Sequence, residues 1–288
     1  MELLLIGDIF LCCLAFIALV IASITDIRKR EVPNWLSFSI IAIAFAVRAI
    51  FSVISLSFSY FFYGLIVFFL FFLICNLLYY GKFFGGGDAK MIIGLATIFA
   101  TTPSFFKNSF FLFDFLINIF VIGSVYSLIF ILFLIAKNRK AFSSELKKIN
   151  KKMKKAKIFF FLFVPVFLIL SVLLSYSVIF IALAITFLLF PYLYIFVKAA
   201  ENASMIKRVH PKNLTEGDWL AKEVKIKNKI IKPSVHGLSL EDIAIIKKHK
   251  KKVLIKYGIP FVPALLIALV LTFLFGNLLL ALIRAIFF

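Results

Sequence analysis

The sequence predicts an all-α polytopic membrane protein of about eight transmembrane helices, with a small cytoplasmic α+β segment. Three observations lead to this class. Hydrophobic residues make up 64% of the 288-residue chain and the mean hydropathy is +1.10, which leaves too little polar surface for a water-soluble domain. Several apolar runs reach the ~20 residues that a helix needs to cross a bilayer. The basic residues, finally, gather in alternate loops between these runs.

The expected spans follow the chain from its first residues to its last. The fourth is short, and the sixth and seventh are close enough in sequence to form a tight hairpin. The eight segments are residues 4–24, 35–55, 61–80, 89–102, 111–136, 158–175, 178–198 and 259–284.

The distribution of charge sets the expected orientation. Of the 33 Lys and Arg residues, all but Arg48, Lys107 and Arg284 lie in or beside four alternate loops. By the positive-inside rule these loops face the cytoplasm and both chain ends lie outside. The net charge of +20 therefore reflects membrane insertion, with attraction to anionic membrane lipid as a secondary effect, and it does not indicate nucleic acid. The four loops are 26–34, 81–88, 137–157 and 199–258.

Five segments are expected. Residues 1–136 form a membrane core with short loops and carry the candidate catalytic residues. A basic cytoplasmic amphipathic segment and a membrane hairpin follow. A small cytoplasmic α+β module and a C-terminal transmembrane helix end the chain. These last four segments are 137–157, 158–198, 199–258 and 259–288.

Local patterns predict elements inside the two cytoplasmic segments. In 137–157 the apolar residues recur at helical spacing and form one stripe, as in helices that lie along lipid head groups. In 199–258, an irregular stretch at 202–217 precedes a small hairpin across Lys227-Asn228. Ser239 is expected to cap a helix that runs to Lys248, and 253–257 to form a strand. The stripe consists of Phe142, Leu146, Ile149 and Met153.

Neither a metal site nor a cofactor is expected. The cysteines lie in apolar spans without a CxxC pair, and the histidines lack the spacing of metal ligands. These residues are Cys12, Cys13, Cys75, His210, His236 and His249.

Acidic residues in or beside a membrane span are costly and are candidate functional residues. Four aspartates qualify: Asp8, Asp26, Asp88 and Asp114. Only Asp26, at the end of the first span, and Asp88, at the start of the fourth, share a depth and a face. The other two lie towards the outer side and are expected to make helix contacts.

Two carboxyl groups close together in a low-dielectric site cannot both ionise. One keeps a proton and the other acts as a base, which is how aspartic proteases activate water. Asp88 follows Gly85-Gly86-Gly87. Glycines let backbone approach closely and permit positive φ, so the triplet suggests an interrupted helix around a site. From spacing alone the alternatives remain open that Asp26 pairs with Arg28 or Lys29, and that Asp88 only caps its helix.

Two motifs resemble those of the prepilin peptidase family. Residues 26–34 read DIRKREVPN after the first span, and residues 85–95 read GGGDAKMIIGL at the fourth. They look like the two aspartate motifs of the GxGD-type membrane aspartic proteases of peptidase family A24, whose archaeal branch includes the preflagellin (prearchaellin) peptidases. The stretch from 214 to 263 is similar to the C-terminal region of some archaeal members. The four-cysteine domain of many bacterial members is absent from this sequence.

The resemblance implies a fold, an activity and a set of site residues. It implies a multi-pass cell-membrane endopeptidase with its active site facing the cytoplasm, Asp26 and Asp88 as the catalytic pair, and Gly85, Gly87 and Lys90 shaping the site. The substrates would be type IV pilin-like or archaellin precursors, which carry a short basic leader before an apolar helix. The oligomeric state stays open.

Three other functions compete with this interpretation. An ion-coupled membrane carrier could use intramembrane aspartates and a glycine-broken helix. A presenilin-like intramembrane protease would share the Gly-x-Gly-Asp motif, and Pro263-Ala264-Leu265 spells that class's PAL motif, but the sequence has no Tyr-Asp dipeptide. A non-enzymatic scaffold on the same fold is disfavoured by the intact aspartates.

Overall fold

The computed structural model describes residues 2–100, 110–174, 177–226, 229–234 and 236–287. It is mostly helical with a small sheet segment, which confirms the predicted class. The chain divides into two compact units, 1–129 with 258–288, and 130–257. The ends of the predicted spans at 101–102 and 175, and the hairpin turn at 227–228, lie outside the described residues.

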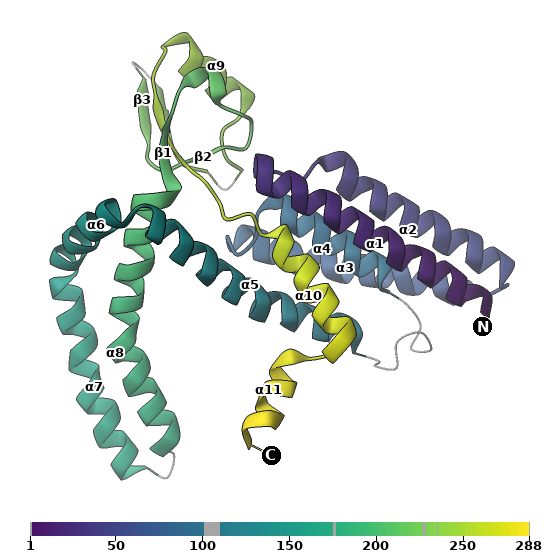
Figure 1. Ribbon diagram of the computed structural model, residues 1–288, viewed down its shortest axis with the longest axis horizontal. Helices are drawn as coiled ribbons and strands as arrows, with labels where there is room; N and C mark the ends of the chain where they lie inside the picture. Colours follow the sequence, from purple (N-terminus) through teal and green to yellow (C-terminus); the bar gives the residue numbers. More distant parts are fainter. Residues whose placement is uncertain (1, 101–109, 175–176, 227–228, 235, 288) are drawn as a thin grey trace. The chain divides into compact units, whose positions relative to one another are not determined.

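The first unit is a helical bundle (Figure 1). Its helices are α1 (Glu2–Lys29), α2 (Asn34–Ile54), α3 (Ser59–Tyr80), α4 (Gly86–Ile98), the first part of α5 (Phe111–Lys137), α10 (Val262–Phe275) and α11 (Leu278–Phe287). Helix α4 packs against α1, α2 and α3. Every residue from Ala89 to Ile98 except Lys90 is buried, which explains why this part of the helix is otherwise almost entirely apolar.

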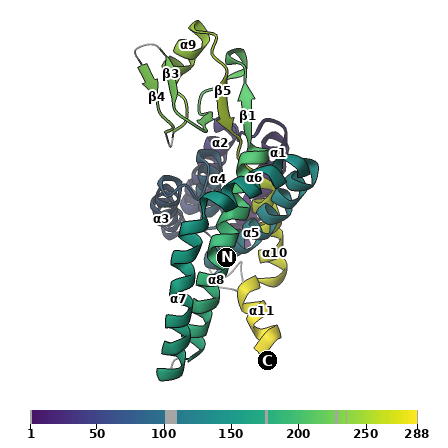
Figure 2. The same cartoon turned by 90° about the vertical axis from the view of Figure 1, so that its left-hand side faces the viewer.

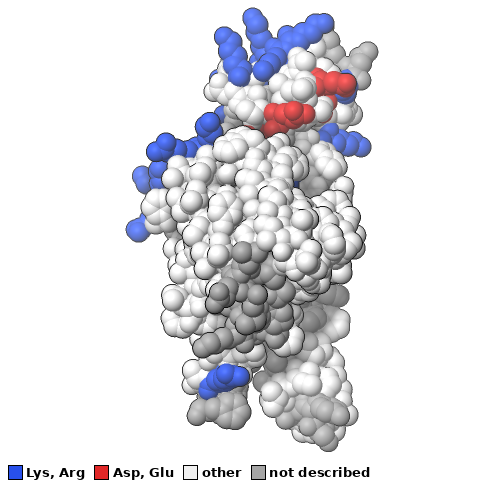
Figure 3. Space-filling view, turned by 90° about the vertical axis from the view of Figure 1, so that its right-hand side faces the viewer, with Lys and Arg blue, Asp and Glu red and all other residues white. Residues whose placement is uncertain are grey.

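The number of spanning helices is lower than the sequence predicts. Among the described residues, six helices are long and apolar enough to cross a membrane, or seven if α10 and α11 form one span bent by 56°. The predicted fourth span is wrong as a full crossing, because α4 has 13 residues and reaches only about 20 Å at 1.5 Å per residue. On the face in Figure 3, the surface of the long helices shows very few charged side chains, as a lipid-facing surface requires.

The second unit begins with helices. The last part of α5, α6 (Arg139–Lys152), α7 (Lys154–Leu173) and α8 (Ser177–Ala200) are followed by a five-residue π-helical turn at Glu201–Met205. Helices α7 and α8 pack together as the predicted hairpin. The apolar stripe of α6 packs on Ile195 and Ala199 of α8. That stripe is therefore covered by protein and is not left for lipid head groups.

The predicted α+β module follows (Figure 2). Strand β5 (Val253–Lys256) pairs with β1 (Ile206–Val209) and β2 (Trp219–Leu220), and β3 (Val224–Ile226) pairs with β4 (Lys229–Ile231). A 3-10 turn at Pro211–Asn213 follows β1. Ser239 accepts a hydrogen bond from the Asp242 amide and caps α9 (Leu240–Lys248), as predicted. The expectation of an irregular stretch at 202–217 is wrong at β1, whose nearest partner in β5 is 44 residues further along the chain (Val209 with Val253).

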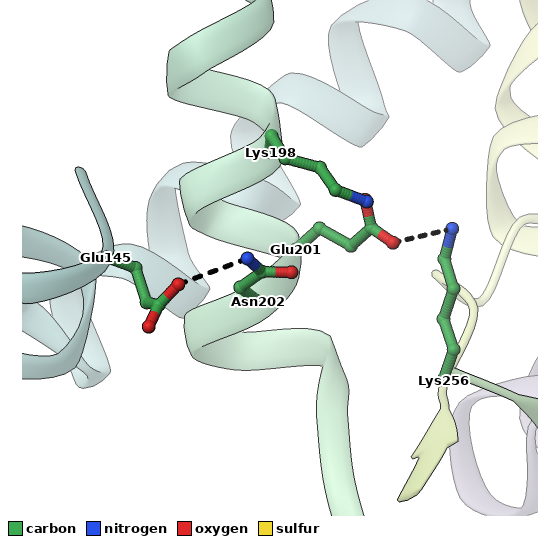
Figure 4. Close-up of polar contacts among 5 residues, drawn as sticks. All are labelled: Glu145, Lys198, Glu201, Asn202 and Lys256. Carbon is green, nitrogen blue, oxygen red and sulfur yellow. Dashed lines mark hydrogen bonds and ion pairs between the residues drawn. The ribbon is translucent and has the colours of Figure 1, made fainter. Parts of the chain in front are cut away.

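A polar cluster in the second unit joins the end of α8 to β5 and α6 (Figure 4). The Glu201 carboxylate pairs with Lys198 at 2.8 Å and with Lys256 at 3.0 Å. Asn202 donates to Glu145 of α6 at 3.1 Å, and this hydrogen bond, with that from Lys148, lowers the pKa of Glu145.

The Glu201 pairs make a testable contribution to the stability of the sheet. Glu201→Gln removes two ion pairs whose lysines are partly exposed, so the loss is about 0.5–1 kcal/mol. Amide exchange in β1 and β5 should then be about two- to five-fold faster in hydrogen-exchange mass spectrometry. Glu223→Gln, which removes an exposed pair at 3.7 Å, is the matched control and should leave exchange in β5 unchanged. Equal exchange in the two variants would contradict this role.

Candidate active site

Asp26 lies in the last turn of α1, and its side chain is buried, with 6% of its surface exposed. The Arg30 amide donates to the Asp26 carbonyl at 2.8 Å and closes this turn. Arg30 has a φ of 59°, a left-handed conformation that costs a residue with a side chain about 1 kcal/mol or more. Arg30 follows the candidate catalytic Asp26 by one turn. Because its conformation is unfavourable by itself, the surrounding contacts must hold the end of α1 in this geometry.

The Asp26 carboxylate has a partner far away in the sequence. Its Oδ2 accepts a buried hydrogen bond of 3.0 Å from the backbone N–H of Val262, the first residue of α10. The Arg30 guanidinium donates to the Gly258 carbonyl of the same lead-in segment. Two residues at the end of α1 are thus tied to the start of α10.

Asp88 lies in the first turn of α4 and is partly buried. Its Oδ2 accepts the Gly85 N–H at 3.2 Å, the arrangement in which a third-position carboxylate caps the residue before the helix. Gly85 has φ −70° and ψ 157°, and the helix starts at Gly86. None of the three glycines has a positive φ, so the expectation of positive φ in the triplet is wrong.

The structure brings the two predicted aspartates together. Helices α1 and α4 pack against each other, and the Asp26 and Asp88 carboxyl groups interact electrostatically. Because both side chains lie in a largely apolar surrounding, the cost of two adjacent negative charges is high. One proton shared between two carboxyl groups is the protonation state that this arrangement favours.

Gly87 and Lys90 connect the two sequence motifs. A Cβ at Gly87 would lie 3.1 Å from the Val32 Cβ, whereas a Cβ at Gly86 would meet only Tyr79, at 3.5 Å. Val32 belongs to the loop that follows Asp26. The Lys90 ammonium donates to the Asn34 side chain at 2.8 Å, at the other end of that loop. The hydrogen bond from Lys90 therefore holds the loop after Asp26 and is not made to either aspartate.

Replacing Gly87 and Gly86 with alanine, one at a time, distinguishes the effect of close backbone approach from the effect of helix propensity. Alanine favours both helical positions by up to about 1 kcal/mol relative to glycine. We expect Gly87→Ala to push Val32 and the loop after Asp26 away and to lower any activity of the aspartate pair about ten-fold. Gly86→Ala should stay within about two-fold of the wild type. Rates of the two variants in one assay test this, and equal rates would show that Val32 yields freely.

The two other intramembrane aspartates have structural partners. Tyr60 donates to Asp8 at 2.5 Å, and Asn277 donates to Asp114 at 2.9 Å. Asn277 lies at the break between α10 and α11, so its contact with Asp114 helps to satisfy polar groups at an interrupted helix. Both aspartates make the helix contacts that were expected of them, and neither joins the pair.

Sequence reasoning missed several residues around the pair. The Val262 amide donates to Asp26, and Arg30 donates to the Gly258 carbonyl nearby. Tyr126 of α5 interacts electrostatically with both Asp26 and Arg30. The ring of Phe261 lies against Phe84, with centroids 5.4 Å apart. The signal that could have located this part of the site is the stretch from Gly258 to Pro263, where glycine and two prolines interrupt an apolar run.

No group of three or more His, Cys, Asp or Glu side chains that could hold a metal ion occurs among the residues that the structure describes. What the arrangement offers chemically is a pair of carboxyl groups, each of which accepts a hydrogen bond from a backbone amide.

Comparison with known proteins covers this part of the chain. Residues 13–137 match the type IV leader peptidase family. The chain is also similar to the prepilin peptidase EppA of Methanocaldococcus jannaschii, with 36% identity over 93 residues, which are 31% of this chain and 24% of that protein. The alignment thus spans about a quarter of that relative's length, and no solved structure matches the chain. These matches confirm the resemblance predicted from the two motifs: Asp26 and Asp88 both lie in the region from 13 to 137, which is similar to the type IV leader peptidase family.

Proposed function

We propose that this protein is a membrane aspartic endopeptidase that removes short basic leader peptides from type IV pilin-like or archaellin precursors at the cytoplasmic membrane face. One observation carries the proposal: Asp26 and Asp88 interact with each other inside the region that matches leader peptidases. The similar protein from Methanocaldococcus jannaschii is a prepilin peptidase, which points to the same substrate class.

The chemistry of the pair fits peptide hydrolysis. An ionised aspartate takes a proton from water while the water oxygen bonds to the scissile carbonyl carbon. The protonated aspartate gives its proton to the carbonyl oxygen. When the tetrahedral intermediate collapses, the C–N bond breaks, the amine takes the first proton, and a hydroxyl proton returns to the second aspartate. Both groups are regenerated, and acid–base catalysis of this kind contributes about 10²–10⁴-fold each.

The position of the pair fits the form of the substrate. Asp26 lies in the last turn of a membrane-spanning helix and Asp88 in the first turn of a buried one. The pair therefore lies at the end of the apolar part of α1, beside the basic residues 28–30. A precursor whose apolar helix lies in the bilayer places the junction with its leader at the head groups, at the end of such a helix.

The test is cleavage of a precursor by the full-length protein in liposomes. The substrate is a peptide with a basic leader, a junction and an apolar helix, and mass spectrometry maps the product ends. We expect one cut at the junction. A matched substrate whose leader Lys and Arg are replaced with Gln should be cut more slowly. Absence of cleavage, together with cation uptake that requires Asp26, would replace the peptidase with the carrier.

A further inference from the structure

The start of α10 forms part of the surroundings of Asp26. The Val262 N–H donates to Asp26 Oδ2 at 3.0 Å in a buried position. Val262 itself has no exposed surface. It lies 236 residues from Asp26 in sequence and well beyond residues 13–137 that match the leader peptidase family. A group from outside the matched region therefore contacts a candidate catalytic carboxylate directly.

The packing around this amide fixes its position. The Phe261 ring lies over Gly123 of α5, where a Cβ would come within 2.6 Å of the ring, and it also packs on Phe84. Pro260 and Pro263 flank the amide and restrict the backbone on both sides. Arg30 holds the lead-in through the Gly258 carbonyl. The donor is held in place before any substrate arrives, as catalysis by preorganised dipoles requires.

The polar groups around Asp26 stabilise a negative charge on it and oppose the cost of burying that charge. The N–H groups of the first helical turn have no partner inside the helix, and the N-terminal end of α10, a helix of 14 residues, attracts anions. Within the described part of the chain, Asp26 interacts with three charged or titratable groups: Arg30 at the end of α1, Asp88 on α4 and Tyr126 on α5. The one cation among these is Arg30, while Asp88 competes with Asp26 for the single negative charge.

We propose that the Val262 N–H, held by the Arg30–Gly258 contact, is a positioning group that keeps Asp26 ionised and oriented as the general base, so that Asp88 is the protonated general acid. This inference rests on the proposed peptidase function. In the reaction, Asp26 takes the proton of the attacking water and later gives it to the leaving amine. Asp88 protonates the carbonyl oxygen and recovers its proton when the carbonyl of the product forms.

The first test removes the donor and keeps the side chain near its size. Val262→Pro lacks the N–H, and proline is accepted at the first position of a helix. Loss of a hydrogen bond to a charged group is expected to lower kcat about 10- to 100-fold. Because the ionised form of Asp26 is then less stable, the acidic limb of the pH–rate profile should move up by about one pH unit. Val262→Ala keeps the N–H and should lose rate through packing alone, with the acidic limb unmoved.

A second pair of variants covers the case that the proline disturbs the backbone of Phe261. Arg30→Gln removes the cation beside Asp26 and weakens the tie to Gly258, and it should also move the acidic limb to higher pH. Arg30→Lys restores the charge and should bring the limb most of the way back. Wild-type pH profiles for folded Val262→Pro and Arg30→Gln would overturn the inference. Absence of cleavage by the wild type at every pH would instead overturn the proposed function itself.

Discussion

Replacing either Asp26 or Asp88 with Asn is expected to lower the rate of precursor cleavage at least about 1,000-fold. Asparagine keeps the size of the side chain but neither takes a proton from water nor supplies one to the carbonyl oxygen. The Val262 and Gly85 amides can still donate to the amide oxygen at 26 and 88, so the folded structure should survive. Initial rates in liposomes, with the thermal unfolding temperature of each variant recorded beside them, measure the effect.

Asp114→Asn is the matched control for this substitution. Asp114 is buried in the same unit and accepts a hydrogen bond from Asn277 at 2.9 Å, which an asparagine oxygen can also accept. Its cleavage rate should stay within about three-fold of the wild type. A folded Asp26→Asn or Asp88→Asn protein that cleaves as fast as this control would remove that carboxyl group from the mechanism.

Replacing Arg48 with methionine is expected to cause the largest loss of stability. Arg48 is fully buried and donates to the Thr97 and Ile98 carbonyls at the end of α4, at 3.1 and 3.0 Å. It also lies 4.5 Å from the Tyr60 ring, whose hydroxyl binds Asp8. A methionine side chain in its place would leave these carbonyls unsatisfied and the Asp8 charge without a nearby cation. Breaking a buried charged network in this way costs about 3–5 kcal/mol.

The comparison for Arg48 is Arg284→Met, which makes the same change at an exposed position of α11. Thermal unfolding in one detergent should show a large drop for Arg48→Met and almost none for Arg284→Met. Because Arg48 holds the end of the helix that carries Asp88, cleavage by Arg48→Met should also fall at temperatures where the variant is still folded. Equal unfolding temperatures for the two variants would show that the buried network contributes little.

The sequence could predict the features that depend on local pattern. The apolar runs and the basic loops predicted a membrane protein, and Ser239 predicted the start of α9. The two aspartate motifs predicted the pair that the structure brings together. Each of these features depends on residues that are close together in the sequence, through helical periodicity, helix capping or the charge bias of membrane insertion. Arg48 stood out only as an exception to the charge pattern, and its role as a cap on α4 became visible with the bundle.

The features that could not be predicted depend on contacts between distant segments. Helix α4 was taken for a full span because burial in protein and burial in lipid select the same apolar residues. The break between α10 and α11 is stabilised by Asn118, which donates to the Gly276 carbonyl at 2.7 Å from another helix. The Val262 amide has no side-chain signature of its own, because every residue except proline carries a backbone N–H; the glycine and prolines between 258 and 263 mark only the segment in which it lies.

The central claim is that Asp26 and Asp88 act as one catalytic unit, and the cleavage rate of the double variant tests it most directly. Groups that act together in one step lose nearly all of their effect when either is removed. We therefore predict that Asp26→Asn with Asp88→Asn cleaves the precursor no more slowly than the slower single variant. A double variant slower by the product of the two single losses would show independent roles and contradict the claim.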